Sequence, residues 1–412
     1  MTECYAPGRS MSQANKFALA VLCGAHFVAD TYATLLYPLL PLLATSLGLS
    51  PRQVFTLAPT YAITSALMQP VYGFISDRYS QRAFAVLGPA VTATFISLVG
   101  LASSYEALVA CLIIGGVGAG AFHPQAAAIA SWSSGSFRRL GVSLFSSSGM
   151  LGQSLGPILI ASIVGATNLS KTYYVAGFGW LATLLLFRYC PSLDRPPRDT
   201  IAGIDRSRKL IRALKSVRSA LIILYLVTVS RVGMQMLIAN YWPFLLKARG
   251  QSVQAIGAVL TAYFMAAALG SFFGGALAER FGGRAMNRYS GFVTAIFLIA
   301  AVLLSGLPSI VCLVFGAAAL MSTTSVNVAL AQEVAPGETS TVSALMMGFA
   351  WGIGALAPAI TEPLTRVFSM QTVLIGAATI PLATALLAAK LPEDRIVRSP
   401  VVEGLGAPGS VD

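Results

Sequence analysis

Long uninterrupted runs of apolar residues are the feature that most limits how this chain can fold. Hydrophobic residues make up 56% of the sequence and charged residues only 10%, whereas a water-soluble domain carries roughly 25% charged residues. A helix needs about 20 apolar residues to cross a bilayer, and this chain has many such runs. Lipid offers no hydrogen bonds to the backbone, so spanning segments are helices or closed barrels. Because the runs lack the alternating pattern of barrel strands, the sequence predicts an all-α polytopic membrane protein.

Polar and Pro/Gly-rich breaks divide the apolar residues into twelve predicted transmembrane helices. They lie near residues 17–47, 53–76, 83–103, 106–131, 140–165, 172–190, 218–247, 253–278, 287–307, 309–333, 340–366 and 370–390. The longest polar stretch separates them into two sets of six. We therefore predict five regions: an N-terminal tail at 1–16, a six-helix bundle at 17–190, a basic linker at 191–217, a second six-helix bundle at 218–390, and a C-terminal tail at 391–412.

The Lys and Arg residues predict the orientation and argue against nucleic-acid binding. If both termini are cytoplasmic, 21 of the 27 Lys and Arg residues lie on the cytoplasmic side and 5 on the other, as the positive-inside rule requires. The net charge of +12 then reflects topology and contact with anionic lipid. The five cysteines have no paired spacing, so neither a metal site nor a disulfide framework is expected.

The two halves repeat at a fixed offset of 202 residues. Pro41, Gly48 and Ser50 match residues of the same type 202 positions later. After the second helix of each half comes the pattern G-x-x-x-[DE]-R-x-x-x-R, formed first by Gly73, Asp77, Arg78 and Arg82, then by Gly275, Glu279, Arg280 and Arg284. Repeats in parallel orientation are typical of the major facilitator fold, with a substrate site near mid-membrane between pseudo-symmetric halves.

Two features predict gating. The acid and arginines of the repeated loop can pair with a neighbouring helix end in one state and separate in another; alternatively, the arginines only satisfy the positive-inside rule. In the fifth helix, Gly152, Gly156 and Pro157 permit close packing and a bend. This run resembles the G-x-x-x-G-P signature of antiporters in the superfamily.

Few ionisable residues lie at membrane depth, where inserting each one into the bilayer costs at least about 2.5 kcal/mol of free energy. Asp30 is near the middle of the first helix, and His26, Thr34 and Tyr37 share its face. His123 lies on the fourth helix. We predict that Asp30 binds and releases protons with His26 or His123 as relay, and the alternative is a static structural pair.

Arg231 occupies a similar depth in the seventh helix, with Gln235 on its face. Because Arg stays charged, we predict it as counter-ion to Asp30 or as a fixed charge for an anionic substrate. We expect the substrate site to comprise Arg231, Tyr37, Thr34, Gln125 and Gln235.

Several motifs resemble the fosmidomycin resistance protein family. They are the runs His26–Asp30, Tyr37–Leu40, Gln69–Gly73 and Gly118–Pro124. The resemblance implies a proton-antiporting exporter of small drug-like or anionic compounds in the bacterial inner membrane. Members of that family commonly have Glu after the Phe-His-Pro run, where this chain has Gln125.

The sequence thus predicts a secondary active transporter, not an enzyme, that exports by alternating access. Alternatives are a proton-coupled importer of a small metabolite anion, and a non-transporting membrane receptor or scaffold. We expect a monomer that binds a small-molecule substrate and membrane lipid, binds no nucleic acid, and uses no cofactor other than protons as coupling ion.

Overall fold

The computed structural model describes residues 15–67, 69, 71–72, 75, 80–192, 217–335, 342 and 345–391. Most of the predicted tails, most of the linker 191–217, and Gly73, Asp77 and Arg78 lie outside the described residues. Ten described helical stretches are long and apolar enough to cross a membrane. The other two predicted spans correspond to α3 with η1 and to η4 with α8. The prediction of an all-α protein of twelve spans in two bundles is confirmed.

The first bundle contains the helices that precede the linker. They are α1 (Lys16–Thr34), α2 (Leu36–Ser46), α3 (Pro51–Ala62), η1 (Ile63–Leu67), α5 (Gln81–Ser97), η2 (Leu98–Leu101), α6 (Tyr105–Ser133), η3 (Gly135–Phe137), α7 (Arg138–Ala166), η4 (Leu169–Val175) and α8 (Ala176–Tyr189).

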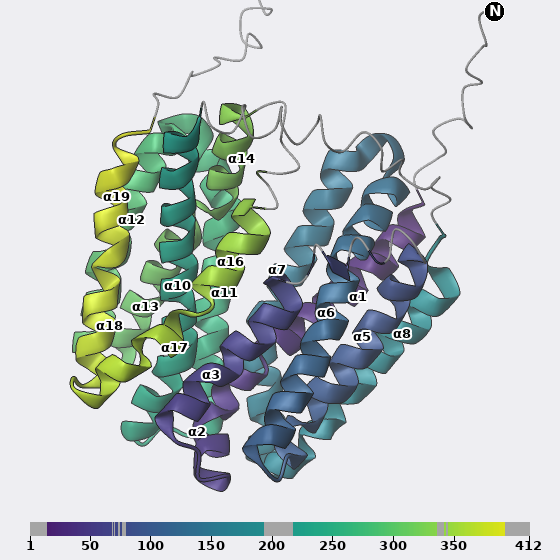
Figure 1. The fold of residues 1–412 in the computed structure, drawn as a ribbon, viewed down its shortest axis with the longest axis horizontal. Coiled ribbons are helices and arrows are strands. Elements are labelled where there is room, and N and C mark those ends of the chain that lie inside the picture. The colour runs from purple at the N-terminus through teal and green to yellow at the C-terminus, as the bar shows by residue number, and fades with distance from the viewer. Residues whose placement is uncertain are drawn as a thin grey trace, which may run out of the picture.

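The second bundle follows the linker and stands beside the first (Figure 1). It contains α10 (Arg218–Ala248), α11 (Val253–Phe281), α12 (Gly283–Leu303), α13 (Gly306–Met321), α14 (Thr324–Val334), η7 (Leu345–Phe349), α16 (Ala350–Gly354), α17 (Ala357–Thr361), η8 (Glu362–Arg366), α18 (Met370–Ala378) and α19 (Ile380–Ala388).

Several spans predicted as single helices are interrupted, and proline explains most of the breaks. Pro38, Pro358 and Pro381 follow the breaks after α1, α16 and α18 by two or three residues. Each proline lacks an N–H group, so a carbonyl of the preceding turn loses its helical partner. The break between α13 and α14 has no proline, and a buried arginine, described below, binds a carbonyl oxygen that this break leaves free.

The start of α1 and the end of α19 lie at the same end of the molecule, which we call the terminal end; the opposite end is the far end (Figure 1). Contacts between the bundles occur toward the far end. The Lys247 ammonium at the end of α10 donates to Pro41 O at 3.0 Å and to Thr45 Oγ1 at 2.8 Å on α2. Ile158 N on α7 donates to Thr261 Oγ1 on α11 at 3.1 Å. In this conformation the bundles are therefore joined at the far end.

The 202-residue repeat predicts the helix caps at the far end. Gly48 and Gly250 follow α2 and α10 with φ of 61° and 77°, a left-handed conformation that glycine adopts without strain. Ser50 and Ser252 then cap α3 and α11, each accepting a backbone N–H three residues later at 3.3 and 3.2 Å. The two halves therefore share these helix caps in structure as well as in sequence.

The last arginine of each repeated loop makes the same contact at the terminal end. Arg82 at the start of α5 donates to Phe187 O at 2.5 Å and to Cys190 O at 2.8 Å at the end of α8. Arg284, at the start of α12, donates to Ala389 O just after α19. Phe187 and Ala389 are themselves 202 residues apart. Each arginine binds carbonyls left free at a helix C-terminus within its own bundle.

Candidate functional site

Glycines on α7 allow it to pack directly against α1. A Cβ atom at Gly152 would collide with the Phe27 carbonyl oxygen, and one at Gly156 with the Thr34 side chain. Small residues at such spacing bring helix backbones together in membranes. The close packing predicted for this glycine run is present, but it joins two helices of the same bundle.

Pro157 explains a hydrogen bond between these two helices. Since Pro157 has no N–H, the carbonyl of Gln153 one turn earlier lacks its helical donor. The Thr34 hydroxyl donates to that oxygen at 2.8 Å. On its other side, Pro157 faces α11, where a Cβ at Gly257 would lie 2.7 Å from the Pro157 carbonyl oxygen. Pro157 therefore lies at the contact between the two bundles.

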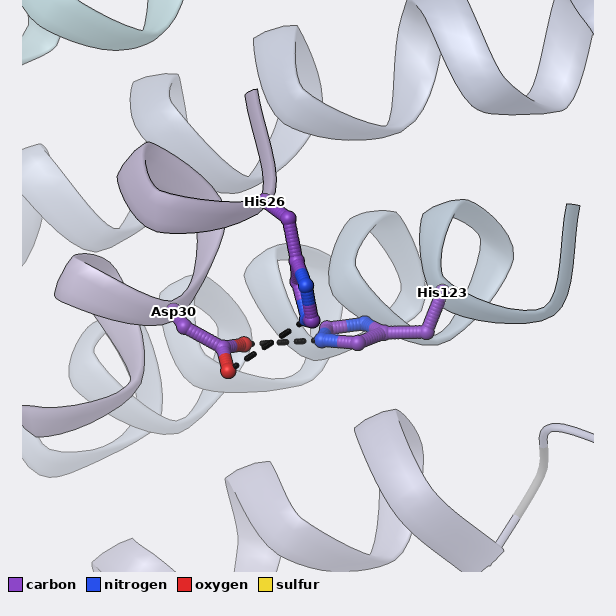
Figure 2. A group of neighbouring side chains, drawn as sticks. All are labelled: His26, Asp30 and His123. Atoms are coloured by element: carbon purple, nitrogen blue, oxygen red, sulfur yellow. Dashed lines mark hydrogen bonds and ion pairs between the residues drawn. The ribbon is translucent and has the colours of Figure 1, made fainter. Parts of the chain in front are cut away.

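Asp30, His26 and His123 converge inside the first bundle (Figure 2). Asp30 Oδ1 lies 2.8 Å from His123 Nε2 on α6, and Asp30 Oδ2 lies 3.5 Å from His26 Nε2 one turn earlier on α1. Gln153 on α7 donates its amide N–H to Asp30 Oδ2 at 2.9 Å. Three helices thus hold one carboxylate.

Gly149 leaves the room that this cluster needs. A Cβ atom there would lie 2.5 Å from His26 Cε1 and 2.6 Å from Asp30 Oδ2. The His26 ring stacks on Phe145, with centroids 4.0 Å apart and ring planes 16° apart. The cluster is therefore packed against α7 with no space for a larger residue at this position.

Backbone carbonyls fix the tautomers of both histidines. His26 Nδ1 lies 2.7 Å from Phe145 O, and His123 Nδ1 lies 2.6 Å from Ala119 O. A carbonyl oxygen only accepts hydrogen bonds, so each Nδ1 carries the hydrogen. In a neutral ring, Nε2 then presents a lone pair toward Asp30.

The contact between Asp30 and His123 therefore contains a proton. A lone pair on His123 Nε2 would repel an ionised carboxylate oxygen at 2.8 Å. Either the imidazole is protonated or the carboxyl is. The 3.5 Å separation from His26 is longer than a hydrogen bond and requires no shared proton. Removing the shared proton converts the attraction into repulsion, so protonation and geometry are linked at this site.

The same three side chains offer ligand atoms within 4.8 Å of one another, which raises the question of a metal ion. Ligands of tetrahedral zinc, at about 2.0–2.1 Å from the metal, lie about 3.3 Å apart. The 2.8 Å contact between Asp30 and His123 is shorter than this and has hydrogen-bond length. The observed geometry therefore fits a proton better than a metal ion.

A cavity of about 150 Å³ adjoins the cluster and is lined by residues of both bundles. Asp30 and His123 line it, as do three residues predicted for the substrate site, Thr34, Tyr37 and Gln235. His26 lies behind them and is not among its lining residues. Proton site and cavity are therefore contiguous, through Asp30 and His123.

Arg231 does not face this cavity, contrary to its predicted role. It is buried in the second bundle, where its guanidinium donates to Leu320 O at 2.8 Å, Asn287 O at 3.1 Å and Ser290 Oγ at 2.8 Å. Leu320 belongs to the last turn of α13, whose carbonyls lack helical partners where the helix breaks. Among the described residues Arg231 makes no contact with Asp30, and its guanidinium binds backbone oxygens and a serine hydroxyl instead.

Gln125 also lies outside the cavity, whereas the gating role predicted for Glu279 and Arg280 stays a prediction. Gln125 is buried on α6 and does not line the cavity. In the second copy of the repeated pattern, Glu279 and Arg280 lie in the last turn of α11, not in a loop, and are exposed, with Arg280 over the Phe281 ring. A Cβ at Gly275 would meet open space, so no close packing explains that glycine.

Sequence reasoning did not select several residues that form the site. These are Gln153, which binds Asp30, and the cavity-lining residues Tyr61, Met236, Phe264 and Trp351. An amide in the middle of a span is costly without partners, so counting uncharged polar residues would have found Gln153. The apolar and aromatic residues carry no such signal, because nearly every span contains them.

The chain resembles transporters over almost its whole length. A family model described as Major Facilitator Superfamily matches residues 22–239 and 223–408. The fosmidomycin resistance protein of Escherichia coli (strain K12) is 28% identical over 385 residues, covering 92% of this chain and 93% of that protein. The uncharacterized MFS-type transporter YfnC of Bacillus subtilis (strain 168) is also 28% identical, over 394 residues, covering 93% of this chain and 94% of that protein.

Solved structures share the same fold. The inward-open xylose transporter XylE from E. coli superposes with a TM-score of 0.73 at 14% identity, covering 92% of this chain and 96% of that one. The resemblance that the sequence motifs predicted is confirmed by the relatives. This chain is a multi-pass membrane protein that belongs to the Major Facilitator Superfamily.

Proposed function

We propose that this protein is a proton-coupled antiporter that exports small drug-like compounds across a bacterial inner membrane. The name of the relative from E. coli, a resistance protein, supports export. In this proposal both termini are cytoplasmic, protons are the coupling ion, and no other cofactor takes part. The distribution of basic residues supports the orientation.

The contact between Asp30 and His123 is the observation that carries the proposal. At 2.8 Å it requires a proton, and it borders the cavity. When that proton leaves, the ionised carboxylate loses its donor from His123 and keeps only the Gln153 amide. A substrate that enters the cavity can then take the vacant hydrogen bond. Proton and substrate therefore compete for one carboxylate, which is the requirement for antiport.

Alternating access provides the transport step. The bundles meet at the far end through the Lys247 contacts and through the Phe55 and Tyr241 rings, whose centroids are 4.4 Å apart. With cytoplasmic termini, these contacts close the external side. Outward opening then requires them to break while the two bundles rock about the cavity.

Import of an anion has less support. It relied on Arg231 as a fixed charge in the cavity, and that guanidinium is bound to carbonyl and hydroxyl oxygens elsewhere. A receptor or scaffold role requires no exchangeable proton at the cavity wall.

Everted membrane vesicles test the proposal. Compounds are first selected by comparing growth inhibition in cells that lack and cells that overproduce the protein. In vesicles with an acidic lumen, an antiporter accumulates a selected compound and raises the lumenal pH, whereas a proton symporter moves it outward. The Asp30→Asn variant should insert normally and lose this gradient-driven uptake. Uptake that Asp30→Asn retains in full would exclude the proposed proton site.

A further inference from the structure

The chemistry of the cavity wall differs between the two bundles. The first bundle contributes the ionisable pair and the hydroxyl and amide groups of Tyr61 and Gln153. The second contributes mainly Met236, Phe264 and Trp351, with Gln235 as its polar member. A ligand that satisfies both sides has a polar group toward Asp30 and an apolar body toward the second bundle.

The cavity wall offers hydrogen-bond acceptors to a ligand, and the unpartnered Tyr61 hydroxyl can accept as well as donate. His123 directs both ring nitrogens at oxygens of Asp30 and Ala119, and the Gln153 amide N–H is directed at Asp30. Gln235 is only 3% exposed, and its Oε1 has no hydrogen-bond partner. A ligand that donates hydrogen bonds therefore complements the carboxylate and this amide oxygen, because an unpaired buried polar group is costly.

Aromatic rings and the absence of fixed positive charge favour a cation. Tyr37, Tyr61, Phe264 and Trp351 line the cavity, and aromatic faces attract ammonium groups. No Lys or Arg is found among the described residues that line it. A carboxylate and several rings around one cavity attract an amine cation and repel an anion.

We infer that the substrates of this transporter are small amine cations with an aromatic or apolar body. The inference rests on the proposed function, because the ammonium group takes the place of the proton at Asp30. The size of the cavity is compatible with it: an apolar cavity of about 150 Å³ holds a benzene-sized molecule, and this cavity has about that volume. A single ring with an aminomethyl group is therefore a suitable minimal probe.

Equilibrium binding to the purified full-length protein tests this inference without a proton gradient. The probes are benzylammonium, neutral benzyl alcohol and anionic phenylacetate, each titrated by ligand-observed NMR. Benzylammonium should bind at least tenfold more tightly than phenylacetate. Its affinity should fall at acidic pH, because protons compete for Asp30.

Two variants separate the contribution of the Asp30 charge to binding from that of the aromatic rings. Asp30→Asn should lower the affinity for benzylammonium at least tenfold and the affinity for benzyl alcohol less than twofold. If Asp30→Asn does not fold, Trp351→Leu supplies the test. Its affinity for benzylammonium should fall three- to fivefold, and its affinity for benzyl alcohol should fall less. The exposed Trp132 on α6 gives the matched control, and Trp132→Leu should change no affinity.

The outcomes distinguish the inference from the proposed function. Phenylacetate binding as tightly as benzylammonium, or more tightly, overturns the inference even if gradient-driven export is observed. Selective benzylammonium binding without gradient-driven movement of any compound supports the inference and contradicts the antiport proposal.

Discussion

The two bundles share their helix caps but treat a buried charge in opposite ways. In the first, Asp30 is held by two histidines, which can gain and lose protons, and by the Gln153 amide, and it borders the cavity. In the second, Arg231 is held by backbone carbonyls and a serine hydroxyl, away from the cavity. The residue 202 positions after Asp30 is Val232, so the repeat did not preserve the acid.

This comparison separates an exchangeable charge from a fixed one. Carbonyl oxygens do not bind or release protons near neutral pH. The groups that hold Arg231 therefore do not change their protonation during a transport cycle. The partners of Asp30 can change in this way. Coupling is therefore expected in one bundle and structural support in the other, and substitutions in each should affect different measurements.

The largest effect on stability is expected from Arg231→Met. The substitution removes the donor that Arg231 supplies to the Leu320 carbonyl in the last turn of α13, and an unsatisfied buried group costs about 1–3 kcal/mol. Unfolding in detergent should show a loss of about 3 kcal/mol, with a smaller loss for Arg231→Lys. The remaining folded protein should retain pH-dependent transport. A stable Arg231→Met protein that has lost only its pH dependence would place the coupling charge in the second bundle.

The next effect concerns His123→Gln, which keeps a donor toward Asp30 but cannot carry the proton. Gradient-driven flux should fall at least tenfold, equivalent to about 1.4 kcal/mol, while the unfolding free energy changes little. Flux in everted vesicles at several lumenal pH values measures this. Cys111→Ala on the same helix is the control and should behave as the unmodified protein. Unchanged pH dependence in His123→Gln would leave His26 as the proton partner of Asp30.

Local chemistry explains which parts of this comparison the sequence predicts. Gly48 and Ser50 act within one or two turns of their own helices, so their roles can be inferred from spacing alone. The pairing of His26 with Asp30 follows from positions four residues apart on one helix. His123 was identified because an ionisable residue in a span is rare.

The position of Arg231 depends on information that no local pattern contains. Its direction is set by the rotation of α10 and by a break in α13 about 90 residues later in the chain. The break itself has no proline signal. The sequence therefore predicted that Arg231 is buried within a span, but not which side of that helix faces the cavity.

A moderate effect is expected from Gly149→Ala. The added methyl group would meet His26 Cε1 and Asp30 Oδ2 at 2.5 and 2.6 Å, and such overpacking costs about 1–3 kcal/mol. Displacing the cluster should lower gradient-driven flux about fivefold. Gly348→Ala is the matched control in the second bundle, because a Cβ there meets nothing within 4 Å. Equal effects of the two substitutions would indicate general helix crowding rather than disturbance of the proton site.

The smallest effect is expected where the two bundles are most alike, at Arg82 and Arg284. Each donates to carbonyls at the end of the last helix of its own bundle, and a cation at a helix C-terminus contributes about 0.3–1 kcal/mol. Arg82→Met should lower the unfolding free energy by about 0.5–1 kcal/mol, and Arg284→Met by at least as much, with transport reduced less than threefold in both. Arg280→Met, which removes an exposed side chain, should change stability by less than about 0.5 kcal/mol. If Arg82→Met instead abolishes transport at unchanged stability, its contact must break during the cycle, and the repeated loop is a gate rather than a cap.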